Sequence, residues 1–181
     1  MGASDPPTKE IDSMIDALLY PSGDWQYRHM RAEALGYLLE HADVAHPRLL
    51  EMLEGDYPSA LLIDSIWRFG RAESVPVLEK LLHESTDITS VAAGHALGNH
   101  PHIEARDALE RALRNSNDQV VASAVAGLVL RADDHSCEAL KAALHHFDEE
   151  LQSRSEIRNR IIAAIDAICH KAPGNDQLAG R

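Results

Sequence analysis

The sequence predicts an all-α fold, a right-handed α-solenoid (an α-α superhelix) of about five helix pairs. Three observations carry this prediction. Apolar residues recur at helical spacing, a 31-residue spacing repeats through the middle of the chain, and aromatic residues are only 4% of the composition. Ala and Leu are abundant instead, and small aliphatic side chains suit closely packed helices better than a β-sandwich.

Equivalent residues lie 31 positions apart in several independent series. These series are Asp56, Asp87 and Asp118; Leu78, Leu109 and Leu140; Leu82, Leu113 and Leu144; and Leu35, Ile66, Leu97 and Leu128. Agreement among them indicates a repeat architecture. The last pair departs from the spacing, because Ile165 follows Leu128 by 37 residues. We therefore expect six extra residues in a helix or a loop near the segment HFDEELQSRSE.

Each unit is expected to contain two short amphipathic helices. The predicted helices are 8–19, 25–41, 46–54, 58–69, 74–83, 87–98, 102–114, 118–131, 136–147 and 153–170. They form one repeat domain over 8–170, between a disordered segment 1–7 and a flexible tail 171–181. Gly36 and Gly98 fall where second helices should end, as C-terminal caps often do.

One segment carries a family resemblance. YRHMRAEALGYL (27–38) resembles the second helix of the HEAT-like repeats named after phycobilisome lyases, which carries Val-Arg, two alanines and then Ala-Leu-Gly. Tyr27 and Arg28 match the Val-Arg pair, and ALG at 34–36 matches the motif. TSVAAGHALGNH (89–100) keeps ALG at 96–98, whereas the segments around 65–67 and 127–129 diverge. The resemblance implies a HEAT-like solenoid but leaves the function open, because such repeats serve scaffolds, enzyme subunits and immunity proteins.

Three branches of this broader class can be compared with the sequence. The DNA-glycosylase branch uses a basic groove, which this acidic chain lacks. The deoxyhypusine-hydroxylase branch holds iron with several His-Glu pairs, but only His83-Glu84 forms such a pair here. The bilin-lyase branch has no compact motif and stays open as an alternative.

Charge and composition restrict the partner and the location. The formal net charge of −12 argues against a nucleic-acid partner, because such proteins neutralise phosphates with Lys and Arg. It favours a basic protein partner and is equally consistent with solubility alone. No apolar run of 18 residues occurs, so no membrane partner is expected and a cytoplasmic location is the default. Cys137 and Cys169 are expected to be small core residues, because their spacing suggests neither zinc binding nor a redox pair.

No sequence motif indicates catalysis or a cofactor. The chain lacks a nucleophile elbow, a phosphate-binding loop and a dinucleotide fingerprint. Eleven histidines raise the question of a metal, but no HExxH or Cys/His spacing is present. We therefore expect a protein that is not an enzyme and carries no metal or cofactor.

The candidate binding surface follows from the repeat. Second helices line the concave side of a solenoid. In the HEAT-like repeats that this chain resembles, the outward positions lie between the buried Val, Ala and Leu positions. The candidate partner-binding residues are Trp25, His29, Met30, Glu33, Tyr37, Tyr57, Leu61, Asp64, Arg68, Ile88, Val91, His95 and Asn99. Apolar Leu61, Ile88 and Val91 are expected at the centre, with acidic residues at the rim. Such a surface suits a basic partner or an amphipathic helix.

Several of these residues have a purely structural alternative. The aspartates at 56, 87 and 118 stand near helix starts, where Asp caps free N–H groups. Trp25 is a candidate hydrophobic staple, and Trp67 a filler between units. Leu61 and Val91 would be buried if the register were wrong by one residue. Seven of the eight aromatic residues precede residue 70, which favours a contact surface in the N-terminal half.

The resulting functional hypothesis is a non-catalytic adaptor that binds another protein through its concave acidic and apolar face. One alternative is an immunity protein that neutralises a basic toxin, such as a nuclease. A second alternative is a bilin lyase or an enzyme accessory subunit. The sequence leaves these three open.

Overall fold

The computed structural model describes residues 8–20, 24–55, 59–84, 87–150 and 154–169. Of residues 8, 25, 26, 84, 87 and 146–150, only the backbone is described. The expected disordered segment 1–7 and the expected tail 171–181 lie outside the described residues, so these two predictions stay open.

The described residues form ten α-helices, as the periodicity predicts. They are α1 (Thr8–Leu19), α2 (Trp25–Glu40), α3 (Ala42–Leu53), α4 (Ala60–Ile66), α5 (Ser74–Glu84), α6 (Asp87–Asn99), α7 (Ile103–Ala112), α8 (Asp118–Arg131), α9 (Asp134–Glu150) and α10 (Ser155–Cys169). A short 3-10 helix, η1 (Trp67–Phe69), follows α4 and ends at Gly70, whose φ is +60°. The expected helix 58–69 is therefore a short α-helix and one 3-10 turn. The expected helix 46–54 begins earlier, directly after α2.

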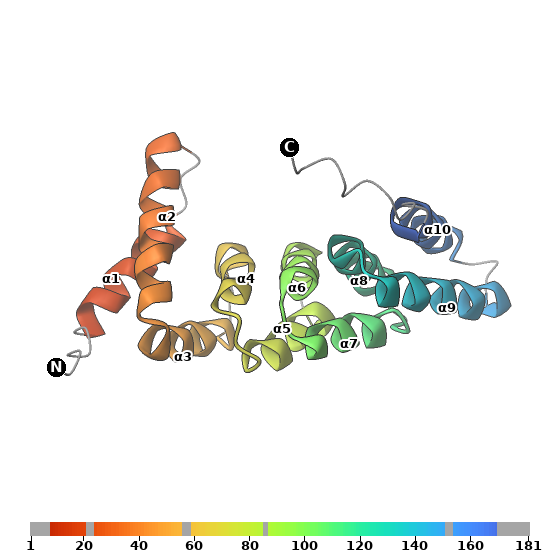
Figure 1. The fold of residues 1–181 in the computed structure, drawn as a ribbon, viewed down its shortest axis with the longest axis horizontal. Coiled ribbons are helices and arrows are strands. Elements are labelled where there is room, and N and C mark those ends of the chain that lie inside the picture. The colour runs from red at the N-terminus through yellow and green to blue at the C-terminus, as the bar shows by residue number, and fades with distance from the viewer. Residues whose placement is uncertain (1–7, 21–23, 56–58, 85–86, 151–153, 170–181) are drawn as a thin grey trace, which may run out of the picture.

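The helices form two rows that follow a shallow arc (Figure 1). The odd-numbered helices α3, α5, α7 and α9 form the outer row, and α4, α6, α8 and α10 form the inner row. Along the inner row α4 packs on α6, α6 on α8 and α8 on α10. The first pair differs, because α2 packs mainly on α1 and α3. This arrangement is the all-α solenoid of helix pairs that the 31-residue spacing predicts.

The repeated apolar series form the continuous core between the rows. Ile66, Leu97 and Leu128 are fully buried, as are Leu78, Leu109 and Leu140 in the outer row. Residues that are 31 positions apart thus occupy equivalent positions in the core of successive units. Each unit buries its apolar face against the next, as stacked repeats must.

The inner row is tightest between α6 and α8, where small residues let two backbones approach. A Cβ atom added to Gly98 would lie 2.5 Å from the carbonyl oxygen of Gly127, and one added to Gly94 would lie 2.5 Å from that of Ser123. The prediction that Gly36 and Gly98 are C-terminal caps is therefore wrong. Both lie inside helices, and among the described residues only Gly70 and Ala132 have positive φ.

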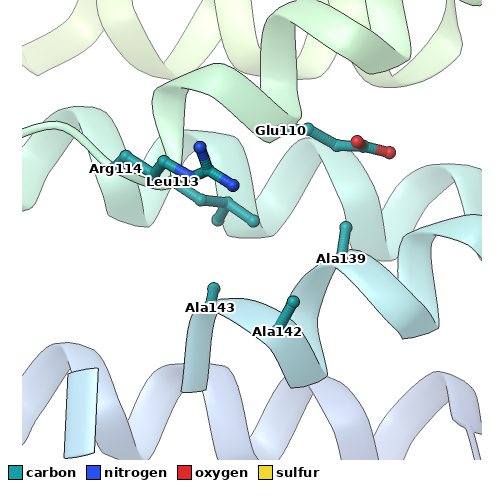
Figure 2. Close-up of a pocket in the computed structure, with 6 residues that line it drawn as sticks. All are labelled: Glu110, Leu113, Arg114, Ala139, Ala142 and Ala143. Carbon is teal, nitrogen blue, oxygen red and sulfur yellow. The ribbon is translucent and has the colours of Figure 1, made fainter. Parts of the chain in front are cut away.

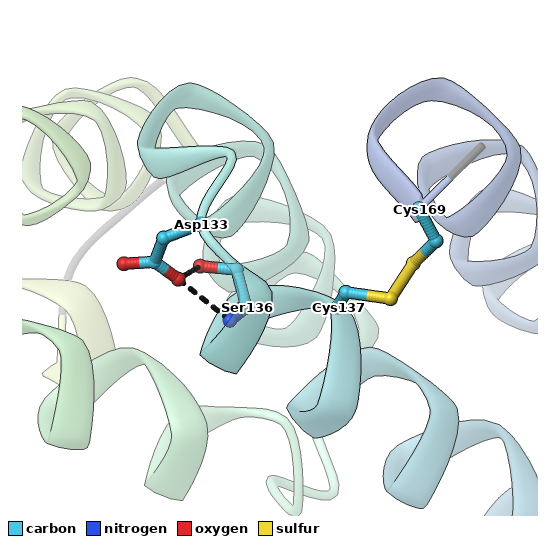
Figure 3. Close-up of a disulfide and its surroundings, with 4 residues drawn as sticks. All are labelled: Asp133, Ser136, Cys137 and Cys169. Carbon is cyan, nitrogen blue, oxygen red and sulfur yellow. Dashed lines mark hydrogen bonds between the residues drawn. A yellow bond between two sulfur atoms is a disulfide. The ribbon is translucent and has the colours of Figure 1, made fainter. Parts of the chain in front are cut away.

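The last pair departs from the spacing because its first helix is longer. Helix α9 has 17 residues, whereas the equivalent α7 has 10. A disulfide joins Cys137, near the start of α9, to Cys169 at the end of α10 (Figure 3). The expectation of two unpaired core cysteines is therefore wrong. The pairing depends on the antiparallel approach of two helix ends, which sequence spacing does not reveal.

Candidate partner-binding face

The inner row leaves one side of each helix uncovered. Helix α6 contacts α4 and α8 on its flanks and α5 and α7 in the outer row, so its remaining side faces the inside of the arc (Figure 1). Along α6 the uncovered stripe is Ile88, Val91, His95 and Asn99. Ile88 is 73% exposed and Val91 37% exposed. All four were predicted as site residues, and the predicted register is therefore confirmed on α6.

The equivalent stripe on α4 mixes apolar and charged side chains. Asp64 and Arg68 are exposed, and Leu61 is half-buried. The guanidinium of Arg68 lies 4.5 Å from the ring centre of Trp67, a distance that allows a cation–π contact. Trp67 is itself half-buried against the core, so the structure favours its role as a filler between units.

The stripe continues on α8 with small residues. Ala122 and Ala126 are half-buried, and Leu130 at the end of the helix is 47% exposed. Leu130 was missed by the sequence reasoning, although it follows the predicted Asn99 by 31 residues and the repeat alone could have found it. The described centre of the face, from Ile88 to Leu130, is therefore mostly apolar and shallow.

The predicted residues of α2 lie apart from the stripes on α4, α6 and α8. His29 and Glu33 are exposed and paired with each other at 3.2 Å, and Met30 is half-buried. Tyr37 stacks on His41, with ring centres 4.3 Å apart. The pKa of Tyr37 is raised, first by burial and then by Glu10 of α1. Tyr37 is thus engaged with neighbouring side chains of the first pair.

The predicted acidic rim is only partly described. Asp56 and Tyr57 lie outside the described residues, and so do the side chains of Trp25 and Asp87. Asp118 is paired with Arg154, which precedes α10, and this pair neutralises its charge. Of the four rim aspartates, Asp64 is the one that is exposed and makes no ion pair with another described residue. The described face is accordingly less acidic than the sequence suggests.

The structural alternative for the aspartate series, helix capping, is wrong for Asp118. The N-cap of α8 is Asn117, whose side-chain oxygen accepts a hydrogen bond from the Gln119 backbone N–H at 2.9 Å. Asp118 is the first helical residue, where its charge still favours the helix dipole.

Two of the histidines, His46 and His100, are buried and structural. His100 is buried, and its Nε2 lies 3.0 Å from the Ser74 hydroxyl. His46 is buried beside Phe69. Burial is the main cause that lowers the pKa of both imidazoles. Among the residues that the structure describes, no group of three His, Cys, Asp or Glu side chains could hold a metal ion.

The comparison with known families identifies the central units. Residues 47–129 match a family model described as HEAT repeats. The central units are therefore similar to HEAT repeats. The two-row arrangement of helix pairs agrees with this match, and the fold is a HEAT-type α-solenoid. The match is to HEAT repeats in general and does not single out the phycobilisome-lyase type. No curated protein is detectably similar to the chain.

The HEAT match fits a binding role more directly than a catalytic one, because HEAT repeats are generally protein-interaction modules. Within the described part of the chain, no helix is long and apolar enough to cross a bilayer.

Proposed function

We propose that this HEAT-repeat protein is a non-catalytic adaptor that binds another protein through the inner face of α4, α6 and α8. The observation that carries the proposal is the uncovered stripe on α6, where the apolar Ile88 and Val91 remain exposed beside His95 and Asn99. Exposed apolar side chains that line up on one face are typical of docking surfaces.

The partner that suits this face is a protein that presents a basic amphipathic helix. Its apolar side would cover Ile88, Val91 and the alanines of α8. Its basic side would face Asp64 and benefit from the formal net charge of −12. Grooves between helices commonly receive an amphipathic helix in this way.

A matched pair of variants tests the face. Ile88→Glu places a charge on the inner face, and Ile103→Glu places the same charge on the outer row, where Ile103 is 56% exposed. Both residues stand in the first turn of a helix, so a glutamate has similar effects on the helix dipole at the two sites. The proposal expects a bound partner, isolated with the wild-type protein and then identified, to be lost with Ile88→Glu and retained with Ile103→Glu.

The result that would sink the inner face is equal retention of the partner by both variants. Salt titration adds a second measurement. A basic partner should bind at least severalfold more weakly as salt rises, because screening weakens attraction between opposite charges. Binding that does not respond to salt would remove the basic character of the partner while leaving the face in place.

A second candidate function is an immunity protein that neutralises a basic toxin. The strong negative charge favours it, since charge complementarity accelerates inhibitor capture. Co-expression of the chain with a toxin encoded beside it should rescue growth, and Ile88→Glu should abolish the rescue. The bilin-lyase alternative depends on the sequence resemblance alone. A bilin whose absorbance is unchanged on mixing with the protein would eliminate it.

A further inference from the structure

A hollow of about 290 Å³ lies between α7 and α9. Both helices belong to the outer row, on the other side of the molecule from the proposed binding face (Figure 1). It is lined by Glu110, Leu113, Arg114, Ala139, Ala142 and Ala143. Figure 2 shows the three alanines of α9 opposite the longer side chains of α7. A single water occupies about 30 Å³ in the liquid, so this volume accommodates a long side chain.

One repeat earlier, the corresponding place is filled from within the chain. Glu79 of α5 accepts two hydrogen bonds from Arg111 of α7, from Nε and from Nη2, each 2.8 Å long. This bidentate pairing is the main cause that lowers the pKa of Glu79. The arginine thereby bridges two successive outer helices.

The 31-residue spacing relates the two places residue by residue. Glu79 corresponds to Glu110, so the glutamate is repeated. Arg111 corresponds to Ala142, so the arginine is absent and a methyl group stands in its place. The hollow thus lies where a second glutamate–arginine bridge would stand, and it holds the glutamate but not the arginine.

The remaining glutamate has acceptor capacity for a new donor. Among the described residues, Glu110 forms an ion pair with Arg106 Nε, one turn earlier on the same helix, at 3.4 Å. That contact is an ion pair only, since the Arg106 Nε–H makes no hydrogen bond. A carboxylate can accept a planar guanidinium through both oxygens, as Glu79 does.

We propose that the hollow binds an arginine side chain presented by a partner protein. The guanidinium would pair with Glu110, and its methylene groups would lie on Leu113 and the α9 alanines. Arginine suits the site better than lysine, because its planar fork matches a carboxylate in two places. Arg114 lies at the other end of the hollow and repels a second cation there, so an acidic residue beside the partner's arginine would add to the fit.

The experiment uses N-acetyl-arginine amide as the probe and the full chain labelled for NMR. At up to about 50 mM, a range that detects weak contacts, the probe should shift the amide signals of 110–114 and 139–143. The lysine analogue should bind more weakly, and the neutral citrulline analogue should not bind. Equal shifts with all three compounds, or no shift with arginine, would overturn the proposal.

Two variants should weaken the proposed arginine site in different ways. Ala142→Arg should fill the hollow with an internal bridge, and Glu110→Gln should remove the charge. Each should weaken probe binding by about fivefold, the upper range for an exposed ion pair. Shifts that persist unchanged in both variants contradict the assignment. Circular dichroism establishes that both variants remain folded.

The matched control is Arg111→Ala, which should create a second hollow beside Glu79. This variant should gain probe-dependent shifts around residue 79 that the wild type lacks. If it gains none, the comparison between the two places fails and the proposal fails with it. The inner-face variant Ile88→Glu should leave probe binding unchanged, so the two proposals can fail independently.

Discussion

The centre of the solenoid and its C-terminal end are held together in different ways. In the centre, α6 and α8 meet backbone to backbone, with Gly98 on one helix against Gly127 on the other. At the end, α9 and α10 are joined by the Cys137–Cys169 disulfide. Arg154 adds an ion pair from the start of α10 to the start of α8. Both regions bury apolar side chains, and the C-terminal end adds a disulfide and an ion pair to that packing.

This difference follows the regularity of the repeat. Where the 31-residue spacing holds, small residues face small residues, and the helices interlock along their length. The longer α9 displaces the last pair from that register. The outer row also differs, although the spacing still holds there. The Glu79–Arg111 bridge between α5 and α7 gives way to the hollow between α7 and α9, because Ala142 stands where the spacing would place an arginine.

Loss of the disulfide should produce the largest effect and confine it to the end. The bridge joins residues 32 positions apart, and the chain-entropy relation gives it roughly 3–4 kcal/mol for a loop of that size. Cys137→Ser combined with Cys169→Ser should accelerate hydrogen exchange in α9 and α10 and leave α6 and α8 protected. Addition of reductant to the wild type should have the same effect, and its addition to the double variant should change nothing further.

Uniform loss of protection along the chain would contradict this separation of centre and end. The disulfide also bears on location, because such bonds persist mainly in oxidising compartments and are usually transient in the cytosol. The cytoplasmic location therefore stays a prediction. The redox state of the two cysteines in protein isolated with its thiols blocked would test it.

Gly98→Ala should damage the centre. The added methyl group meets the Gly127 backbone, which cannot rotate away as a side chain could. Overpacking costs about 1–3 kcal/mol, against a gain in helix propensity of about 1 kcal/mol, so we expect a net loss of up to about 2 kcal/mol. Urea unfolding monitored by circular dichroism measures it.

Gly36→Ala is the matched control for the glycine prediction. Gly36 also lies inside a helix, but a Cβ atom there would meet nothing within 4 Å. It should stabilise α2 by up to about 1 kcal/mol. A loss of stability similar to that of Gly98→Ala would show that the close approach of α6 and α8 is not the cause.

These two regions also mark the limit of what the sequence could predict. The buried leucine series followed from the helical period and the repeat. The exposed positions of α6 followed from the repeat and the family resemblance, which place outward residues between the buried ones. The role of Gly98 did not follow, since a glycine that caps a helix and one that admits a neighbouring backbone look alike in sequence. The pairing of Cys137 with Cys169 required the approach of two helix ends in space. The ion pair between Asp118 and Arg154 could not be predicted either, because Arg154 precedes a helix that is displaced from the 31-residue spacing.

Acid should lower the stability of the early and central units rather than that of the C-terminal end. His46 and His100 lie buried between the early units, and their lowered pKa favours the neutral imidazole in the folded state. The unfolded chain, with an ordinary histidine pKa near 6.5, then binds more protons than the folded one. The stabilisation they provide is therefore complete above about pH 6.5 and is lost as the pH falls below it.

The groups around these two histidines decide the size of this response. Burial is the largest cause that lowers the pKa of both histidines. Arg71 lowers the pKa of His46 further, and His102 and Arg131 lower that of His100 further. Glu73 acts in the opposite direction on His46. His46→Phe should flatten the fall in unfolding free energy between pH 7 and pH 5, because phenylalanine does not titrate. The replacement costs no hydrogen bond at His46 Nε2, which has no hydrogen-bond partner. An unchanged pH profile would remove His46 from the cause.

The smallest expected effect is that of the ion pair between Asp118 and Arg154. Asp118 is largely exposed, so the pair should contribute about 0.5–1 kcal/mol in a double-mutant cycle of Asp118→Asn and Arg154→Gln. The exposed pair Glu156–Arg160 within α10, at 3.1 Å, is the control and should couple less, because it fastens α10 to nothing else.

The same cycle repeated without the disulfide tests how the end is fastened. If the disulfide positions α10, the coupling between Asp118 and Arg154 should shrink towards zero once both cysteines are serine, because the mobile helix no longer holds the two charges together. If the coupling persists at full strength, α10 is held by its packing on α8, as the central helices are, and the contrast between centre and end disappears.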